Sequence, residues 1–428
     1  MQRINITKPS TVRHLSTMFF NNVTKAAPDV MYHLKVQADG DTSPVKVDLG
    51  VGIYRNEQGV YNEMKVLKDA KKDMAAANPD HDYEVTTGNA SFLKNAAKVV
   101  FGKDSTLLQA GRVASAQTIS GTGAVHIAFL LLSRSVPGMS KAVYVGTPTW
   151  GNYVPMLDLV GLEVRTYRHY DPKTGTVDWK SVLNAVRTAE KGTTFILQGC
   201  CHNPTAADFT KEQWRILAQE MKKRELFPLF DIAYQGLGNG LEEDIYSVRH
   251  FAEQGFEMLV CQSFSKNFGL YGERVGAVHA VCPTADITAA VHDQLRFLIR
   301  TEFSSSPAYG ARLVDIVLSD PSREAVWREE LEAIYERLQG NRAKLSNLLI
   351  NVYKTPGDWS IITKGTGLFS LLPLSQAQCK ELQDKYHIYL VTNGRVTISG
   401  LNEKNIDYVA KSIDKVVRQS QLGISSKI

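Results

Sequence analysis

The sequence predicts an α/β protein with a mostly parallel sheet flanked by helices. From about Ala142, short apolar or β-branched runs alternate with polar clusters and with longer stretches at helical spacing. This alternation is typical of repeated βα units. At 428 residues the chain is also too long for a single small core, so we expect one large domain with a smaller satellite, or two comparable domains.

The predicted strands are short and lie between longer helical stretches. A helix is expected over Lys211 to Lys223. No internal repeat and no low-complexity segment interrupts the pattern. The predicted strands are Ala142 to Val145, Thr194 to Leu197, Phe227 to Phe230, Met258 to Cys261 and Val275 to Val278.

Polar or aromatic residues follow four successive strands of this series. In open α/β sheets, ligands bind outside the carboxyl ends of the strands, so these residues are candidates for a functional site. A sheet with only a structural role would not need them there. The four segments are Thr147-Pro148-Thr149-Trp150, Cys201-His202-Asn203-Pro204-Thr205, Asp231-Ile232-Ala233-Tyr234 and Gln262-Ser263-Phe264-Ser265-Lys266.

Composition and charge argue against several classes of function. The formal net charge is +5, and the first 28 residues contribute +4 of it, ahead of the first acid at Asp29. The body of the chain is close to neutral, so no nucleic-acid partner is expected. Five cysteines without a CxxC pair favour free thiols over disulfides or zinc, and no metal is expected. The longest apolar helical candidate, Ala124 to Leu132, is about half a membrane span, so we expect a soluble protein.

Both ends of the chain resemble targeting segments. Residues 1–20 are basic, rich in hydroxyl groups and free of acids, as mitochondrial presequences are, although an idle tail has the same composition. The last three residues, Ser426-Lys427-Ile428, differ by one substitution from a peroxisomal signal. We expect a cytoplasmic protein, with the mitochondrion and the peroxisome left open as alternatives.

Lys266 is the residue on which the predicted chemistry depends. A lysine this close to the end of an apolar strand would be partly desolvated, which lowers its pKa and frees the neutral amine to attack an aldehyde. Taken alone, it would more often be a surface lysine. Its neighbours Ser263, Ser265 and Arg274 offer hydroxyls and a guanidinium to a phosphate. The segment 120–123 (SGTG) opens a predicted helix, whose N-terminus attracts anions.

Four further side chains complete the contacts that pyridoxal phosphate needs. The carboxylate of Asp231, at the end of a buried strand, needs a cationic partner, and a protonated pyridine nitrogen would be one. Tyr234 and Asn203 are donors for the phenolic oxygen of the ring, and Trp150 offers a flat face for stacking. Each has an ordinary structural explanation by itself, but together they predict pyridoxal phosphate as the cofactor.

The chain resembles the fold-type I aminotransferases, and within them the aspartate aminotransferases, from about Pro28 to Val417. The resemblance implies a large cofactor-binding domain at residues 62–333. It also implies a small domain, built from residues 28–61 and 334–428, that closes over the substrate. From their composition, residues 1–27 are expected to be a basic leader or a disordered N-terminal arm. The blocks that carry the resemblance are VDLGVGIYR, SGTGAVHIA, HNPT, FDIAYQG, CQSFSKNFGLYGERVG and GRVTISGLN.

The resemblance implies a role for each candidate residue. Lys266 would hold the cofactor as a Schiff base and carry a proton between the substrate Cα and the cofactor. Asp231 would contact the pyridine nitrogen. Tyr234 and Asn203 would contact the phenolic oxygen, and Trp150 would stack on the ring. The implied phosphate site comprises Ser120, Gly121, Thr122, Ser263, Ser265, Arg274 and, from a neighbouring subunit, Tyr83.

Two arginines are implied to select the substrate. Arg395 matches the residue that binds the α-carboxylate, and Arg300 matches the one that a partner subunit offers to the side-chain carboxylate. A second cation selects dicarboxylic acids, because leaving it unpaired is costly. The implied reaction is amino-group transfer between L-aspartate and 2-oxoglutarate, giving oxaloacetate and L-glutamate, in a homodimer with shared sites. Gly52, Trp150 and Asn203 are also expected at the substrate.

Several positions depart from the family pattern. Tyr153 and Gln198 stand where the family commonly has histidines that support the carboxylate matching Asp231, so hydrogen bonding around the pyridine nitrogen is expected to differ. Ala206 follows HNPT in place of a glycine, and this loop should differ slightly in conformation. Phe303 replaces a common tryptophan.

Three alternatives stay open from the sequence. An aminotransferase of the same fold for aromatic or mixed substrates would share the cofactor contacts, with Arg300 as the discriminating residue. A fold-related lyase or decarboxylase would release ammonia or carbon dioxide from aspartate without an oxo acid. A non-enzymatic binding protein on the same scaffold would have no use for Lys266 as a Schiff-base lysine.

Overall fold

A seven-stranded sheet forms the centre of the molecule. The computed structural model describes residues 19–425; most of the predicted leader and the C-terminal Ser426-Lys427-Ile428 lie outside them. All five predicted runs fall within strands of this sheet, and α8 spans Lys211–Lys223 as predicted. In spatial order the strands are β2 (Val113–Ile119), β10 (Val275–Val281), β9 (Met258–Ser263), β8 (Phe227–Ile232), β7 (Thr194–Gln198), β3 (Ala142–Thr147) and β4 (Glu163–Arg168).

The strand β10 runs against the other six. It pairs antiparallel with both β2 and β9, whereas the pairs from β9 across to β4 are parallel. The expectation that Val275 to Val278 belongs to a series of parallel βα units is therefore wrong in direction. The connection from β9, residues 264–274, contains no helix. Because a parallel crossover generally needs one, the chain instead turns back alongside β9.

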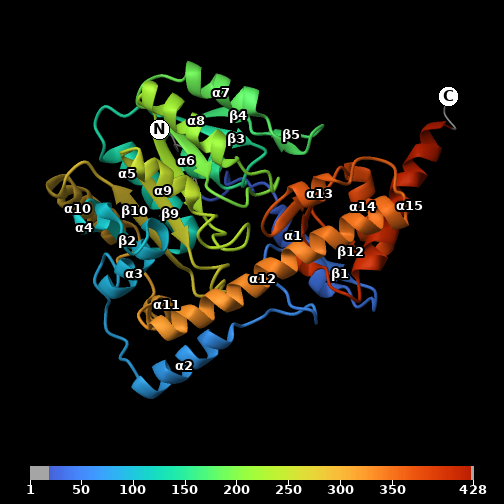
Figure 1. The fold of residues 1–428 in the computed structure, drawn as a ribbon, viewed down its shortest axis with the longest axis horizontal. Helices are drawn as coiled ribbons and strands as arrows, with labels where there is room; N and C mark the ends of the chain where they lie inside the picture. Colours follow the sequence, from blue (N-terminus) through green and yellow to red (C-terminus); the bar gives the residue numbers. More distant parts are fainter. Residues whose placement is uncertain (1–18, 426–428) are drawn as a thin grey trace, which may run out of the picture.

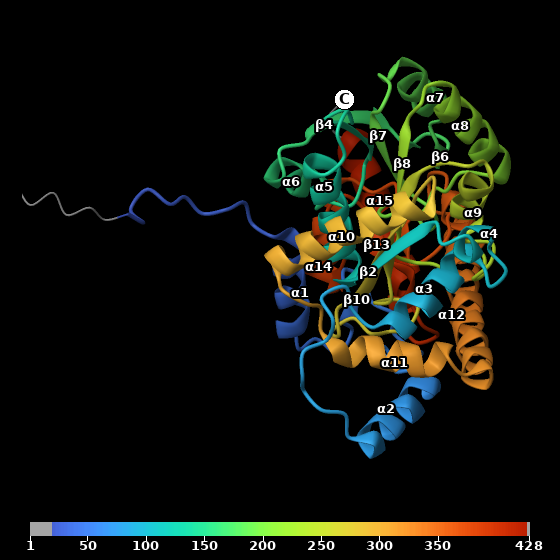
Figure 2. The same ribbon diagram turned by 90° about the vertical axis from the view of Figure 1, so that its left-hand side faces the viewer.

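Helices cover both faces of the sheet (Figure 2). Leu229 and Leu259 pack in the cluster on the α5 side, whereas the next residues, Phe230 and Val260, pack in the cluster on the α8 side. Successive side chains of a strand point to opposite faces, so each strand contributes to both clusters. The helices around the sheet are α3 (Ala90–Phe101), α4 (Thr106–Gln109), α5 (Ser120–Arg134), α6 (Tyr153–Leu159), α7 (Trp179–Thr188), α8, α9 (Tyr246–Glu253), α10 (Ala285–Glu302) and α11 (Ala308–Leu318). The helix α2 (Lys65–Ala77) packs against α11, farther from the sheet.

A second group of elements lies at the far end of the long helix α12 (Pro321–Asn347) (Figure 1). The N-terminal and C-terminal parts of the chain meet there, since β1 pairs with β12. The division of the chain into domains stays a prediction, and its boundary at residue 334 falls inside α12. The remaining elements are α1 (Val30–Gly40), β1 (Val47–Asp48), β5 (Tyr170–Asp171), β6 (Thr176–Val177), the π-helix η1 (Leu348–Val352), α13 (Ile361–Lys364), β11 (Phe369–Leu371), α14 (Gln376–Tyr386), β12 (Ile388–Tyr389), β13 (Arg395–Thr397), η2 (Ile398–Gly400) and α15 (Ile406–Ser425). Among the helices between residues 19 and 425, none has the length and apolar character needed to cross a membrane.

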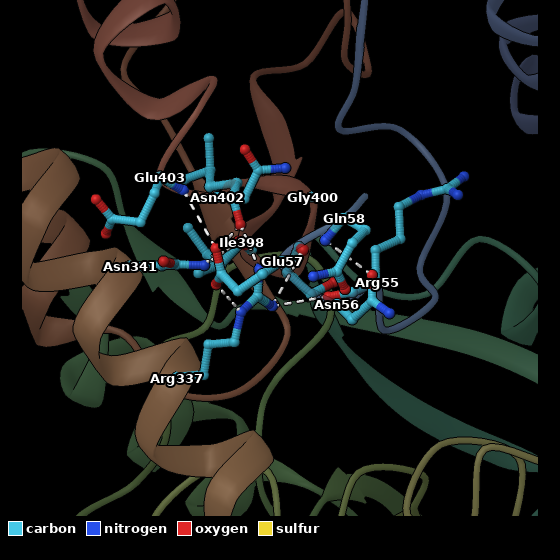
Figure 3. A network of polar contacts seen from close by, with 12 residues as sticks. Arg55, Asn56, Glu57, Gln58, Arg337, Asn341, Ile398, Gly400, Asn402 and Glu403 are labelled. Atoms are coloured by element: carbon cyan, nitrogen blue, oxygen red, sulfur yellow. Dashed lines mark hydrogen bonds and ion pairs between the residues drawn. The ribbon is translucent and has the colours of Figure 1, made fainter. Parts of the chain in front are cut away.

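Arg337 ties α12 to this second group (Figure 3). Its guanidinium donates to the backbone carbonyls of Arg55 and Leu401, both at 2.7 Å, and it pairs with Glu57. Arg55 and Leu401 lie far apart in the sequence. One largely buried side chain therefore joins the N-terminal loop, α12 and the segment before α15.

Replacing Arg337 with methionine should lower the thermal unfolding midpoint by roughly 3–6 °C. Methionine keeps the aliphatic stem but removes the guanidinium, so the Arg55 carbonyl loses its donor and the Leu401 carbonyl keeps only the amide of Asn341 at 2.9 Å. Scanning fluorimetry of the purified protein measures the shift. Arg296→Met is the matched control, because Arg296 is exposed on α10 and pairs with Asp293 one turn away, so its loss should shift the midpoint by less than about 1 °C. Equal shifts in the two variants would contradict the role of Arg337.

Candidate functional site

A cavity of about 240 Å³ opens at the carboxyl ends of β3, β7, β8 and β9. These four strands are neighbours in the sheet, so the residues that follow them meet at one edge. The cavity is lined by Gly52, Ser120, Gly121, Thr122, Trp150, Gln198, Asn203, Asp231, Ala233, Tyr234, Ser263, Ser265, Lys266, Tyr271 and Arg274.

Lys266 enters the cavity from the connection between β9 and β10. Its amine lies 4.8 Å from the centre of the Tyr234 ring. Desolvation lowers the pKa of the Lys266 amine from 10.5 to about 8; Asp231 opposes this shift, and the positive charge of Arg274 adds to it. The neutral amine is thus available near physiological pH, as a nucleophilic lysine requires.

Asp231 is the buried carboxylate of the cavity, with 9% of its surface exposed. The phenol of Tyr153, at the start of α6, donates to its Oδ2 atom at 2.5 Å. Burial raises the pKa of the Asp231 carboxyl, while the Tyr153 hydrogen bond and the charge of Lys266 act to lower it. Tyr153, which departs from the pattern of the resembling family, therefore provides a hydrogen-bond donor to the carboxylate.

Asn203 and Trp150 are held by their neighbours at the same edge. The backbone N–H of Asn203 donates to the Gln198 side chain at 2.8 Å, and the Gln198 amide donates to the backbone carbonyl of Asn203 at 3.1 Å. Gln198 thus hydrogen-bonds to both the backbone N–H and the backbone carbonyl of Asn203. The Trp150 ring stands edge-on to the Tyr153 ring, with the ring centres 5.1 Å apart.

An anion-binding corner lies where α5 begins. Arg274 donates to the Ser120 hydroxyl at 2.6 Å, and the Ser120 N–H donates to the Arg274 carbonyl at 2.9 Å. Among residues 19–425, no carboxylate pairs with Arg274. The first amides of α5, from Gly121 and Thr122, lack partners inside the helix, and Ser263 and Ser265 line the same corner. A guanidinium, hydroxyls and a helix N-terminus together suit a phosphate.

Arg395 lies beside the cavity, on β13. Its guanidinium contacts the carbonyl of Gly50 at 2.8 Å and the side chain of Asn203 at 3.4 Å, and stands 4.5 Å from the centre of the Phe369 ring. Its Nε is buried without a hydrogen-bond partner, and no carboxylate of the described chain pairs with it. Because an unpaired, partly buried cation is costly, Arg395 is suited to receive an anionic ligand.

Tyr83 and Arg300 do not reach this cavity within one chain. Tyr83 is 90% exposed and lines a different surface pocket, together with Tyr309 and Arg312. Arg300 is exposed near the end of α10, where its Nη1 donates to the Ser304 hydroxyl at 2.5 Å. Both residues are the ones that the family resemblance assigns to a neighbouring subunit.

Three residues of the site escaped the sequence analysis. Tyr271 lines the cavity and accepts the N–H of Tyr54 at 2.8 Å. It lies five residues after Lys266 in the same connection, and this proximity could have predicted that it lies at the site. Met31 approaches Arg395 with its sulfur at 3.2 Å, and Phe369 packs beneath it. No sequence spacing links these two to Arg395, because they meet only through the tertiary fold.

One group of potential metal ligands occurs among the described residues. Cys200, Cys201 and Asp244 bring their ligand atoms within 4.8 Å of one another. The Asp244 carboxylate already accepts the backbone N–H groups of Gly236, Gly238 and Asn239, and burial raises the pKa of the Cys201 thiol. The group therefore has a structural explanation as buried, hydrogen-bonded side chains.

The chain is similar to several known proteins. It is 49% identical over 401 residues to "Aminotransferase tasG" of Hapsidospora irregularis, covering 94% of this chain and 97% of the relative. The solved structure of aspartate aminotransferase from Saccharomyces cerevisiae cytoplasm matches with a TM-score of 0.90 and 39% identity, covering 94% of this chain and 99% of that one.

A third match is to an aminotransferase with a different named substrate class. The crystal structure of an aromatic-amino-acid aminotransferase from Burkholderia pseudomallei, covalently bound to pyridoxal phosphate, has a TM-score of 0.90 and 37% identity, covering 93% of this chain and 99% of that one. The family model "Aminotransferase class I and II" matches residues 44–413. The chain belongs to this family and is a transaminase that uses pyridoxal phosphate.

Proposed function

We propose that the enzyme is an aspartate aminotransferase, transferring the amino group reversibly between L-aspartate and 2-oxoglutarate. The observation that carries this proposal is a pair of arginines, Arg395 and Arg300, neither of which pairs with a carboxylate among residues 19–425. Two unpaired cations suit the two carboxylates of a dicarboxylic acid. Arg395 would bind the α-carboxylate, and Arg300 of a second copy would bind the side-chain carboxylate.

The donor set of the cavity suits pyridoxal phosphate. Among residues 19–425 Arg274 has no carboxylate partner in the anion-binding corner, and Asp231, which lines the same cavity, can offer a carboxylate to a protonated ring nitrogen. Tyr234 and Asn203 line this cavity too, and they can donate to the phenolic oxygen. The remaining predicted contacts are proposed for Ser120, Gly121, Thr122, Trp150, Ser263, Ser265 and, from the partner copy, Tyr83.

Each residue of the cavity would have a distinct role in the proposed reaction. The cofactor, when bound, supplies the electron sink that makes the substrate Cα–H acidic. Lys266 would then take the proton from Cα and return it to the cofactor, since its lowered pKa leaves a neutral amine as general base. Asp231 would keep the ring nitrogen protonated. Gly52 would lie against the substrate, with Trp150 and Asn203 beside it.

A homodimer follows from the same proposal, because the site of one chain lacks two of its implied residues. The exposed Tyr83 and Arg300 would complete the cavity of the neighbouring copy. For location, we propose the cytoplasm; the composition of residues 1–20 keeps the mitochondrion as an alternative and Ser426-Lys427-Ile428 keeps the peroxisome.

The direct test of the proposed reaction is the formation of oxaloacetate from aspartate and 2-oxoglutarate by the purified holoenzyme, with Lys266→Ala as the control. We expect turnover that falls by at least about 10⁴-fold in the variant, because the general base and the covalent anchor are both lost. Release of ammonia or carbon dioxide without an oxo acid would instead indicate a lyase or decarboxylase. A bound cofactor without turnover of aspartate would contradict the proposed substrate.

Replacing Arg300 with glutamine should reduce kcat/KM for aspartate by about 100-fold or more, because a buried carboxylate would lose its cationic partner. Phenylalanine has no second carboxylate, so its kcat/KM should change by less than about threefold. Arg296→Gln, one turn away on the exposed side of α10, is the matched control and should leave both values unchanged. Equal losses for aspartate and phenylalanine would favour an aromatic or broad-specificity aminotransferase.

The rate at which the apoenzyme captures pyridoxal phosphate should rise with pH up to about 8 and then level off. Only the neutral amine of Lys266 adds to an aldehyde. Because its pKa is lowered to about 8, the neutral fraction is about one half at pH 8 and approaches its maximum roughly one unit above. Stopped-flow absorbance at constant ionic strength measures this profile. A rate that still rises steeply through pH 10 would show an unperturbed amine.

A further inference from the structure

Tyr153 has no role in the reaction proposed above, although it is the residue that contacts the Asp231 carboxylate most closely. It is the first residue of α6, directly after the segment that ends β3. Its side chain is fully buried, with 0% of its surface exposed. A tyrosine hydroxyl at such a position needs a hydrogen-bond partner, and it has one in Asp231 at 2.5 Å.

The surroundings of Asp231 give this contact particular weight. Among the described residues, Tyr153 is the one donor that hydrogen-bonds to the Asp231 carboxylate. The other titratable groups near it are Lys266, Tyr234 and the buried thiols of Cys261 and Cys200. Asp231 also lines the cavity, whereas Tyr153 does not, so the carboxylate joins the buried phenol to the cavity.

The chemistry of a phenol differs from that of an imidazole at this position. Burial, followed by the charge of Asp231, raises the pKa of the Tyr153 phenol well above its ordinary value. The group therefore remains a neutral donor throughout the range in which a histidine would titrate. The same ring stands edge-on to Trp150, with the ring centres 5.1 Å apart, so one side chain contacts two of the residues expected at the cofactor ring.

We propose that Tyr153 is a positioning residue that orients the Asp231 carboxylate toward the ring nitrogen of the bound cofactor and braces Trp150 against its face. The inference rests on the proposed role of Asp231 and deepens it. Hydrogen bonds to a charged group are stronger than those between neutral groups. Without the phenol, the carboxylate loses the donor that favours its ionised form, and the ring nitrogen loses part of its positive charge.

Tyr153→Phe removes one oxygen and keeps the ring beside Trp150, so the fold should be retained. The full-length holoenzyme of this variant should bind pyridoxal phosphate about tenfold more weakly. The pH midpoint of the visible absorbance of the bound cofactor should rise by about half a unit or more, roughly a threefold change in the equilibrium. The midpoint rises because a less positive ring makes the nitrogen that joins it to the lysine more basic.

Two further variants make these readouts specific. Tyr153→His offers a ring donor again and should recover part of the midpoint shift. Tyr167→Phe is the matched control, because Tyr167 is a buried tyrosine of β4 for which we propose no contact with the cofactor; its midpoint should equal that of the unaltered protein. An unchanged midpoint in Tyr153→Phe, or a shift of the same size in Tyr167→Phe, would overturn the inference.

A double-mutant cycle with Asp231→Asn separates this inference from the proposed function. If Tyr153 acts through Asp231, adding Tyr153→Phe to Asp231→Asn should produce no further shift of the midpoint. A full additional shift in the double variant would overturn the inference while leaving the role of Asp231 intact. A midpoint unaffected by Asp231→Asn alone would overturn the role of Asp231 itself and the Tyr153 inference with it.

Discussion

The hydrogen bond between Tyr153 and the buried carboxylate of Asp231 is the contact on which the rest of the site depends. A carboxylate at the end of an internal strand is costly unless donors or cations face it. Here one phenol donates to it, and the amine of Lys266 lies in the same cavity. Within residues 19–425, no arginine pairs with this carboxylate, and Arg274 and Arg395 have no carboxylate partners. These separated charges suit a ligand that carries both a cationic ring nitrogen and anionic groups such as a phosphate and a carboxylate.

The sheet topology explains how these groups meet. Parallel strands deliver Asn203 and Asp231 to one edge from successive turns of the chain. The antiparallel direction of β10 keeps the connection before it, residues 264–274, at the same edge of the sheet. Because residues 264–274 turn back without a helix, Lys266 and Arg274 return to the edge that β9 has just reached, and Arg274 joins the first residue of α5.

Much of this arrangement was predictable from the sequence, and the failures have physical causes. The strand runs and the cavity residues around Lys266 follow from local patterns, since each residue lies next to the end of an apolar run. The direction of β10 could have been predicted from the length of the connection before it. Residues 264–274 are too few, and lack the helix, for a crossover to a parallel strand. The approach of Met31 to Arg395 joins residues more than 360 positions apart, and no local pattern encodes it. Tyr83 and Arg300 lie outside the cavity of one chain, so the roles proposed for them would require a second copy.

The most direct test of this account locates the lysine that carries the cofactor. The holoenzyme is reduced with borohydride, digested, and the peptides are sequenced by mass spectrometry. The account predicts one modified residue, Lys266, because desolvation makes its amine the nucleophile of the cavity. Modification spread over exposed lysines, or confined to a different lysine, would contradict it.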